Sequence, residues 1–127
     1  MYKFYNANVH GNFVNDCVVR AIAVAEGKTW DEAYDELSEL AQDDGILLDD
    51  VRFVEDYLDD RYERVPHYSK TVGEFAEEYP IGTYLVTMPG HITVIIDSKV
   101  YDIFDCRNRT MWCAWRVPKV HNNFRRS

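Results

Sequence analysis

Long apolar runs are absent from this 127-residue chain, since no uninterrupted stretch approaches the roughly 18 residues that a membrane span needs. The first residues, MYKFYNANVH, also lack the apolar core of a secretory signal. No CxxC spacing occurs among the three cysteines, and their odd number leaves at least one thiol free. We therefore expect one domain, residues 1–127, that resides in the cytoplasm and has no membrane partner.

Proline and glycine are scarce, with four and six residues, and no linker, repeat or low-complexity tract interrupts the chain. An apolar fraction of 46% with 28% charged residues excludes collagen-like and disordered classes. Residues 26–78 hold 18 acids and 5 bases, whereas the last 21 residues hold six bases and no acid. Because the net charge is −8, most of the surface should repel a phosphate backbone, and nucleic acid is not an expected partner.

Four helices are predicted before residue 80. The first has apolar residues at i, i+3, i+4 and i+7 spacing, with Asn15 or Asp16 placed as its N-cap and Gly27 at its end. Capping boxes at Thr29-Trp30-Asp31-Glu32 and Thr71-Val72-Gly73-Glu74 begin the second and fourth. The predicted ranges are 17–27, 30–42, 50–59 and 72–79.

From residue 83 the apolar pattern changes to the alternation typical of strands. The predicted strands are 83–88, 91–96, 100–104 and 111–117. Helices come first and strands second, which predicts an α+β fold with N-terminal helices packed on a C-terminal antiparallel sheet.

Cys17 and His91 are the residues most suited to chemistry. Cys17 opens the first helix, where unpaired N–H groups and the helix dipole stabilise a thiolate and lower the pKa of the thiol. A small side chain that merely fits a buried helix start is the alternative. His91 begins a strand directly after Pro89-Gly90, where its ring could lie in a cleft and serve as a general base.

A histidine base needs a third group that holds its other ring nitrogen, and two aspartates could supply it. If the hairpin loop is Asp97-Ser98-Lys99, His91 faces Asp105 on the return strand. If the loop is only Asp97-Ser98, His91 faces Phe104, and Asp102 lies diagonally on the same side. The residues alone leave both registers open.

Three segments together resemble the papain-like cysteine peptidases. They are Asn15-Asp16-Cys17-Val18-Val19-Arg20-Ala21 opening a helix, Gly90-His91 opening a strand, and Tyr101-Asp102-Ile103-Phe104-Asp105 on the return strand. The chain is most similar to the small bacterial and phage-encoded members, including those that cut leader peptides at double-glycine sites. The likeness covers about 20 residues in detail, spread over residues 12–105. It implies a papain-like fold and the cytoplasm of a bacterium or of a phage-infected bacterium.

The resemblance also implies roles for individual residues. Cys17 would be the nucleophile and His91 the general base and then acid, with Asp105 as the orienting acid in preference to Asp102. The family completes its oxyanion hole with a Gln or Asn side chain and the backbone N–H of the cysteine. No glutamine precedes Cys17 here, so Asn12 is the candidate, with Asn15 as a weaker one. The expected substrate is a peptide or protein, and we expect no metal ion or other cofactor.

Two other functions stay open. One is a weak or inactive papain-like module that binds and modulates a host or partner protein through its acidic helices at 29–60. The other is an acyl transferase that uses the same cysteine with an amine as acceptor. Four aromatic residues could line a substrate cleft, although core packing is the simpler interpretation: Tyr84, Phe104, Trp112 and Trp115. Cys106, Cys113 and His121 match no common zinc-ligand spacing.

Overall fold

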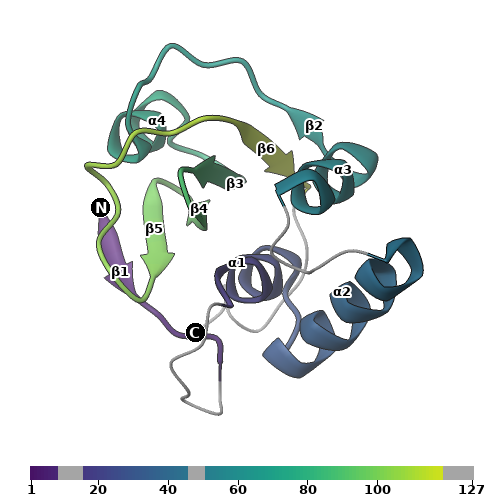
Figure 1. The fold of residues 1–127 in the computed structure, drawn as a ribbon. Coiled ribbons are helices and arrows are strands. Elements are labelled where there is room, and N and C mark those ends of the chain that lie inside the picture. Colours follow the sequence, from purple (N-terminus) through teal and green to yellow (C-terminus); the bar gives the residue numbers. More distant parts are fainter. Residues whose placement is uncertain (9–15, 46–50, 119–127) are drawn as a thin grey trace.

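The computed structural model describes residues 1–8, 16–45 and 51–118, and within them the chain forms four helices and one six-stranded mixed sheet (Figure 1). The helices are α1 (Cys17–Glu26), α2 (Trp30–Asp44), α3 (Val51–Arg61) and α4 (Val72–Glu78). The strands are β1 (Tyr2–Phe4), β2 (Glu63–Arg64), β3 (Thr83–Met88), β4 (His91–Ile96), β5 (Lys99–Asp102) and β6 (Ala114–Val117). The predicted α+β class is confirmed. In the parts of the chain just given, no helix combines the length and apolar character needed to cross a membrane.

Local sequence signals set the helix ends. Both predicted capping boxes are present: Thr29 accepts a hydrogen bond from the backbone N–H of Glu32, and Thr71 accepts one from that of Glu74. Gly27 ends α1 in the left-handed conformation, with a φ of 68°. Asp16 is the N-cap residue of α1, but the prediction that its side chain caps the helix is wrong, because the carboxylate accepts from other side chains instead.

The sheet has the order β1-β5-β4-β3-β6-β2. The prediction of a purely antiparallel sheet is wrong at one edge, because β1 pairs with β5 in parallel and sets Phe4 beside Asp102. The other pairs are antiparallel. A three-residue strand shows no periodicity from which its pairing could be predicted. The N-terminal segment also donates the Tyr5 N–H to the backbone oxygen of Asp102 at 2.9 Å, which fixes the end of β5.

The loop between β4 and β5 has two residues, Asp97 and Ser98, because Ile96 pairs with Lys99. Both loop residues have positive φ angles, 47° and 71°, as a tight hairpin turn requires. Continued along the strands, this register sets His91 opposite Phe104, and their ring centroids lie 4.8 Å apart. Of the two registers open from sequence, the structure has the one that favours Asp102.

Apolar side chains on the two sheet faces build two cores. On one face α1 packs directly on the sheet, and α2 and α3 contribute to the same core, which includes Ile22, Leu58 and Trp115. The other packs against α4 around Phe75. In Figure 1, α1 lies against the sheet and α2 lies on the outer side of α1. This layering brings the start of α1 to the end of the sheet where β4 begins and β5 ends.

Candidate active site

Cys17 and His91, 74 positions apart, meet at the junction of α1 and β4. The Cys17 thiol lies close enough to His91 and to the backbone of Ile92 for both to lower its pKa, and both Cys17 and His91 line one pocket. Cys17 is 8% exposed, so it lines this pocket as a buried residue rather than standing on an open surface. The structure therefore brings together the two residues that the sequence selected.

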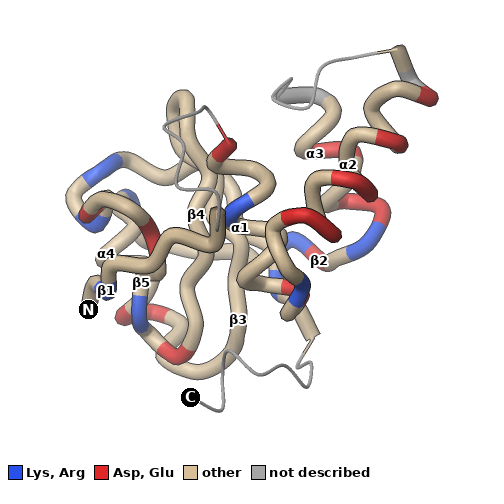
Figure 2. The backbone as a smooth tube through the Cα atoms, turned by 90° about the horizontal axis from the view of Figure 1, so that it is seen from below, with Lys and Arg blue, Asp and Glu red and all other residues tan. Residues whose placement is uncertain are grey.

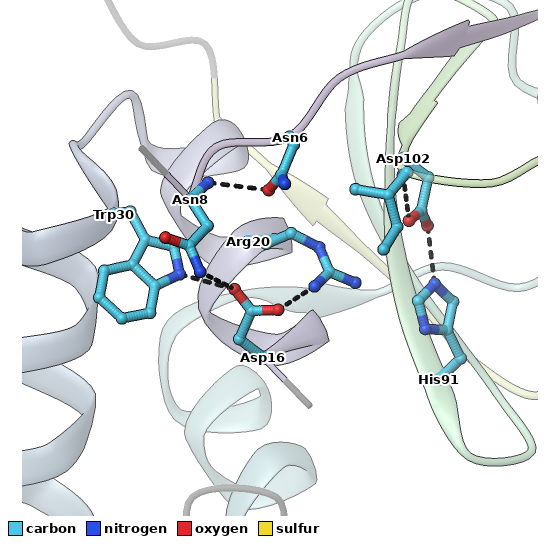
Figure 3. Close-up of polar contacts among 8 residues, drawn as sticks. Asn6, Asn8, Asp16, Arg20, Trp30, His91 and Asp102 are labelled. Carbon is cyan, nitrogen blue, oxygen red and sulfur yellow. Dashed lines mark hydrogen bonds and ion pairs between the residues drawn. The ribbon is translucent and has the colours of Figure 1, made fainter. Parts of the chain in front are cut away.

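The carboxylate that contacts His91 belongs to Asp102. His91 Nε2 lies 2.7 Å from Asp102 Oδ2, and both side chains are buried (Figure 3). The Ile103 N–H donates to the other carboxylate oxygen at 2.7 Å, and the Cys106 thiol lies 3.8 Å from Oδ2. Because Nε2 is committed to Asp102, Nδ1 is the ring nitrogen left to exchange a proton with Cys17.

The preference for Asp105 over Asp102 is corrected by this geometry. Asp105 is exposed, and its carboxylate accepts two hydrogen bonds from the Arg107 guanidinium, at 2.9 and 2.7 Å. The two-residue hairpin loop ends the pairing of β5 at Asp102. As a result, Asp105 lies in the segment after the strand and not beside the histidine.

The contacts favour a charged pair at the site. Burial by itself opposes ionisation of all three groups, but the contacts outweigh it. Asp102 and Cys17 raise the pKa of His91 to about 9. His91, with a smaller effect of Arg20, lowers the pKa of Cys17, and His91 also lowers the pKa of Asp102. The contacts therefore favour a thiolate, an imidazolium and a carboxylate in series.

His91, Asp102 and Cys106 also form a group whose ligand atoms lie within 4.8 Å of one another, which could hold a metal ion. Two features favour the hydrogen-bonded arrangement instead. The 2.7 Å separation of His91 Nε2 and Asp102 Oδ2 is a hydrogen-bond distance and leaves no room for an ion between them. Burial and the nearby Asp102 charge raise the pKa of Cys106 to about 12, so this thiol keeps its proton in the hydrogen-bonded arrangement.

A second cluster fixes the start of α1 beside Cys17. The buried Asp16 carboxylate accepts hydrogen bonds from Trp30 Nε1 at 2.8 Å and Asn8 Nδ2 at 3.1 Å, and pairs with Arg20 (Figure 3). These partners come from the N-terminal segment, from α1 and from the first turn of α2. Asp16 thus ties three segments together one residue before Cys17.

We expect Asp16→Ala to lower the free energy of unfolding by about 3 kcal/mol, because it leaves three buried or half-buried donors without their shared acceptor. Urea denaturation followed by tryptophan fluorescence measures this loss. Asp35→Ala, on the exposed side of α2, removes the same charge and should cost less than about 0.5 kcal/mol. Equal losses in the two variants would contradict the anchoring role.

Of the remaining predicted site residues, some lie near Cys17 and His91, some lie in the cores, and some lie outside the described residues. Trp112 is half exposed and lines the pocket at Cys17, and Phe104 packs on His91, whereas Tyr84 and Trp115 are buried in the two cores. The oxyanion candidates Asn12 and Asn15, and His121 of the rejected zinc spacing, lie outside the described residues.

Sequence reasoning missed Arg20, Trp30 and Cys106 as neighbours of the site. Arg20 lies four residues after Asp16, a spacing that places both on one helix face and that could have indicated the pair. No comparable signal indicates Trp30 or Cys106.

No family model, curated protein or solved structure matches this chain. The site therefore rests on its own geometry.

Proposed function

We propose that this protein is a cysteine peptidase or related amide hydrolase with a papain-like fold, in which Cys17, His91 and Asp102 form the catalytic triad. The observation that carries the proposal is the continuous series of contacts from the Cys17 thiol through the His91 ring to the buried Asp102 carboxylate. A thiol at a helix start, a base within hydrogen-bond reach and an acid that orients the base are what thiol acyl transfer requires. The resemblance to papain-like peptidases points to the same chemistry.

The reaction proceeds through an acyl-enzyme. The Cys17 thiolate attacks the amide carbonyl carbon, and a C–S bond forms as the carbonyl oxygen takes the negative charge. The C–N bond then breaks, and His91 Nδ1–H gives its proton to the departing amine. Water attacks the thioester while His91 takes one of its protons, and the acid product leaves with Cys17 again a thiolate and His91 again an imidazolium.

Asp102 contributes by fixing the histidine. Its carboxylate holds Nε2–H, which keeps Nδ1 directed at sulfur and stabilises the imidazolium. The backbone N–H of Cys17, in the first turn of α1, is one donor for the oxyanion, and Asn12 remains the proposed second donor.

The first test is the pH dependence of Cys17 alkylation by iodoacetamide, followed by peptide mass mapping. Because the pKa of Cys17 is lowered, we expect its alkylation to stay rapid as the pH is lowered. At pH values where it is still rapid, an ordinary thiol such as glutathione should react at least tenfold more slowly. Hydrolysis, where a substrate is found, should decline as the pH rises through about 9, because deprotonated His91 can no longer protonate the leaving amine.

His91→Ala is the matched control for this profile. It removes the imidazolium that lowers the pKa of Cys17, so alkylation at pH 6 should slow at least tenfold and follow the titration of an ordinary thiol. If the native protein itself followed that titration, the hydrolase proposal would fail, and a binding module on the same scaffold would take its place.

A further inference from the structure

The pocket beside the Cys17–His91 pair has the size and lining of a specificity pocket. Its volume is about 160 Å³, and α1, α3, β3 and β4 contribute apolar walls that include Val18, Val54 and Met88. An apolar cavity of roughly 150 Å³ accommodates benzene. The pocket therefore has room for one large apolar side chain next to the nucleophile.

Glu55 is the one carboxylate among the described residues that line this pocket. Its side chain is 35% exposed, and Arg64 Nη2 lies 4.0 Å from its Oε1. Arg64 makes its hydrogen bonds to Asp59 instead, at 2.8 and 2.9 Å. Among the side chains that the structure describes, no base is hydrogen-bonded to Glu55, so its carboxylate can accept a cation at the pocket.

Glu55 belongs to α3, one of two acidic helices. α2 carries seven carboxylates and no basic residue, and α3 carries four carboxylates against two arginines. Figure 2 shows these acids following one another along the two helices. A surface of one charge sign attracts ligands of the opposite sign and raises their association rate.

We infer that the substrate is a cationic peptide segment, which places a large apolar side chain in the pocket and a neighbouring Lys or Arg against Glu55. This inference rests on the proposed function for its chemistry, because Cys17 lines the pocket. Its support comes from a different feature of the structure. The pocket combines apolar walls with one carboxylate, Glu55, whose separation from the Arg64 guanidinium is 4.0 Å.

Binding to a Cys17→Ala variant tests the inference without relying on turnover. The probes are fluorescein-labelled octapeptides that carry one Phe flanked by Lys, by Gln or by Glu, with binding measured by anisotropy at low salt. We expect the Lys peptide to bind about tenfold more tightly than the Gln peptide, and the Glu peptide to bind most weakly. Raising the salt to 0.5 M should remove most of the difference.

Glu55→Gln, in the Cys17→Ala background, should reduce the preference for Lys over Gln about fivefold, and Glu55→Lys should favour the Glu peptide. Asp60→Asn is the matched control, because it removes one exposed charge from the same helix without lining the pocket. Its effect should stay within twofold. Equal binding of the Lys and Gln peptides, or an equal loss in Asp60→Asn and Glu55→Gln, would overturn the inference.

Failure of the inference is distinguishable from failure of the proposed function. Cleavage of the three peptides at equal rates by the native protein would refute the cationic substrate and leave the hydrolase intact. Ordinary thiol reactivity of Cys17 would refute the hydrolase, while the binding comparison would still decide which peptide the pocket takes.

Discussion

Cys17→Ser should abolish hydrolysis, with a fall in kcat of about 10⁵-fold or more, because the serine hydroxyl stays protonated where the thiol becomes a thiolate. Asp102 still raises the pKa of His91 in this variant, but a histidine base activates a serine hydroxyl only where the whole site is built for it, and here the site is built around a thiolate. The substitution changes one atom at a site that is 8% exposed, so the free energy of unfolding should change by less than about 1.5 kcal/mol. Single-turnover assays on a cleaved peptide and urea denaturation measure the two effects separately.

Cys113→Ser provides the matched control for this loss. Cys113 is a half-buried free thiol outside the pocket lining, and its Sγ accepts from Arg64 at 3.4 Å. Turnover should remain within twofold of the native rate. If Cys17→Ser retained native turnover, the nucleophile assignment would be wrong, whatever the reactivity of the other thiols.

Much of the fold could be predicted because local rules govern it. The two capping boxes, the glycine at the end of α1 and the alternation in β3 and β4 depend on residues within one or two turns of each other. The elements whose formation depends on distant partners were missed. β1 and β2 have three and two residues, too few to show a period, and they form only because β5 and β6 offer free edges.

In the site, too, the features that depend on local sequence could be predicted, and those that depend on distant partners could not. Cys17 and His91 could be selected from their positions at the starts of a helix and a strand. The residues alone did not decide which carboxylate contacts His91, because a hairpin loop of two or three residues changes which side chain lies beside it, and the resemblance favoured Asp105 instead of Asp102. That choice depends on Asp97 and Ser98 both adopting positive φ, a conformation uncommon for residues other than glycine and not indicated by the sequence.

The importance of that register can be measured. We expect Asp102→Asn to lower kcat/KM by about 10²–10⁴-fold, because a neutral amide cannot stabilise the imidazolium and can present its N–H₂ to Nε2, which favours the wrong tautomer. Loss of the carboxylate also lowers the pKa of His91, so the alkaline decline of activity should move below about pH 9. A pH–rate profile of the variant measures both effects.

Asp105→Asn makes the same chemical change three residues later. Its carboxylate lies on the surface and holds only Arg107 among the described side chains, so kcat/KM should remain within twofold and the alkaline limit should stay near pH 9. The shift of the pH limit separates a role in holding the imidazolium from a structural role, because simple loosening of β5 would reduce the rate without moving that limit. If Asp105→Asn were the more damaging change, Asp105 rather than Asp102 would be the orienting acid, and the triad would have to be reassigned.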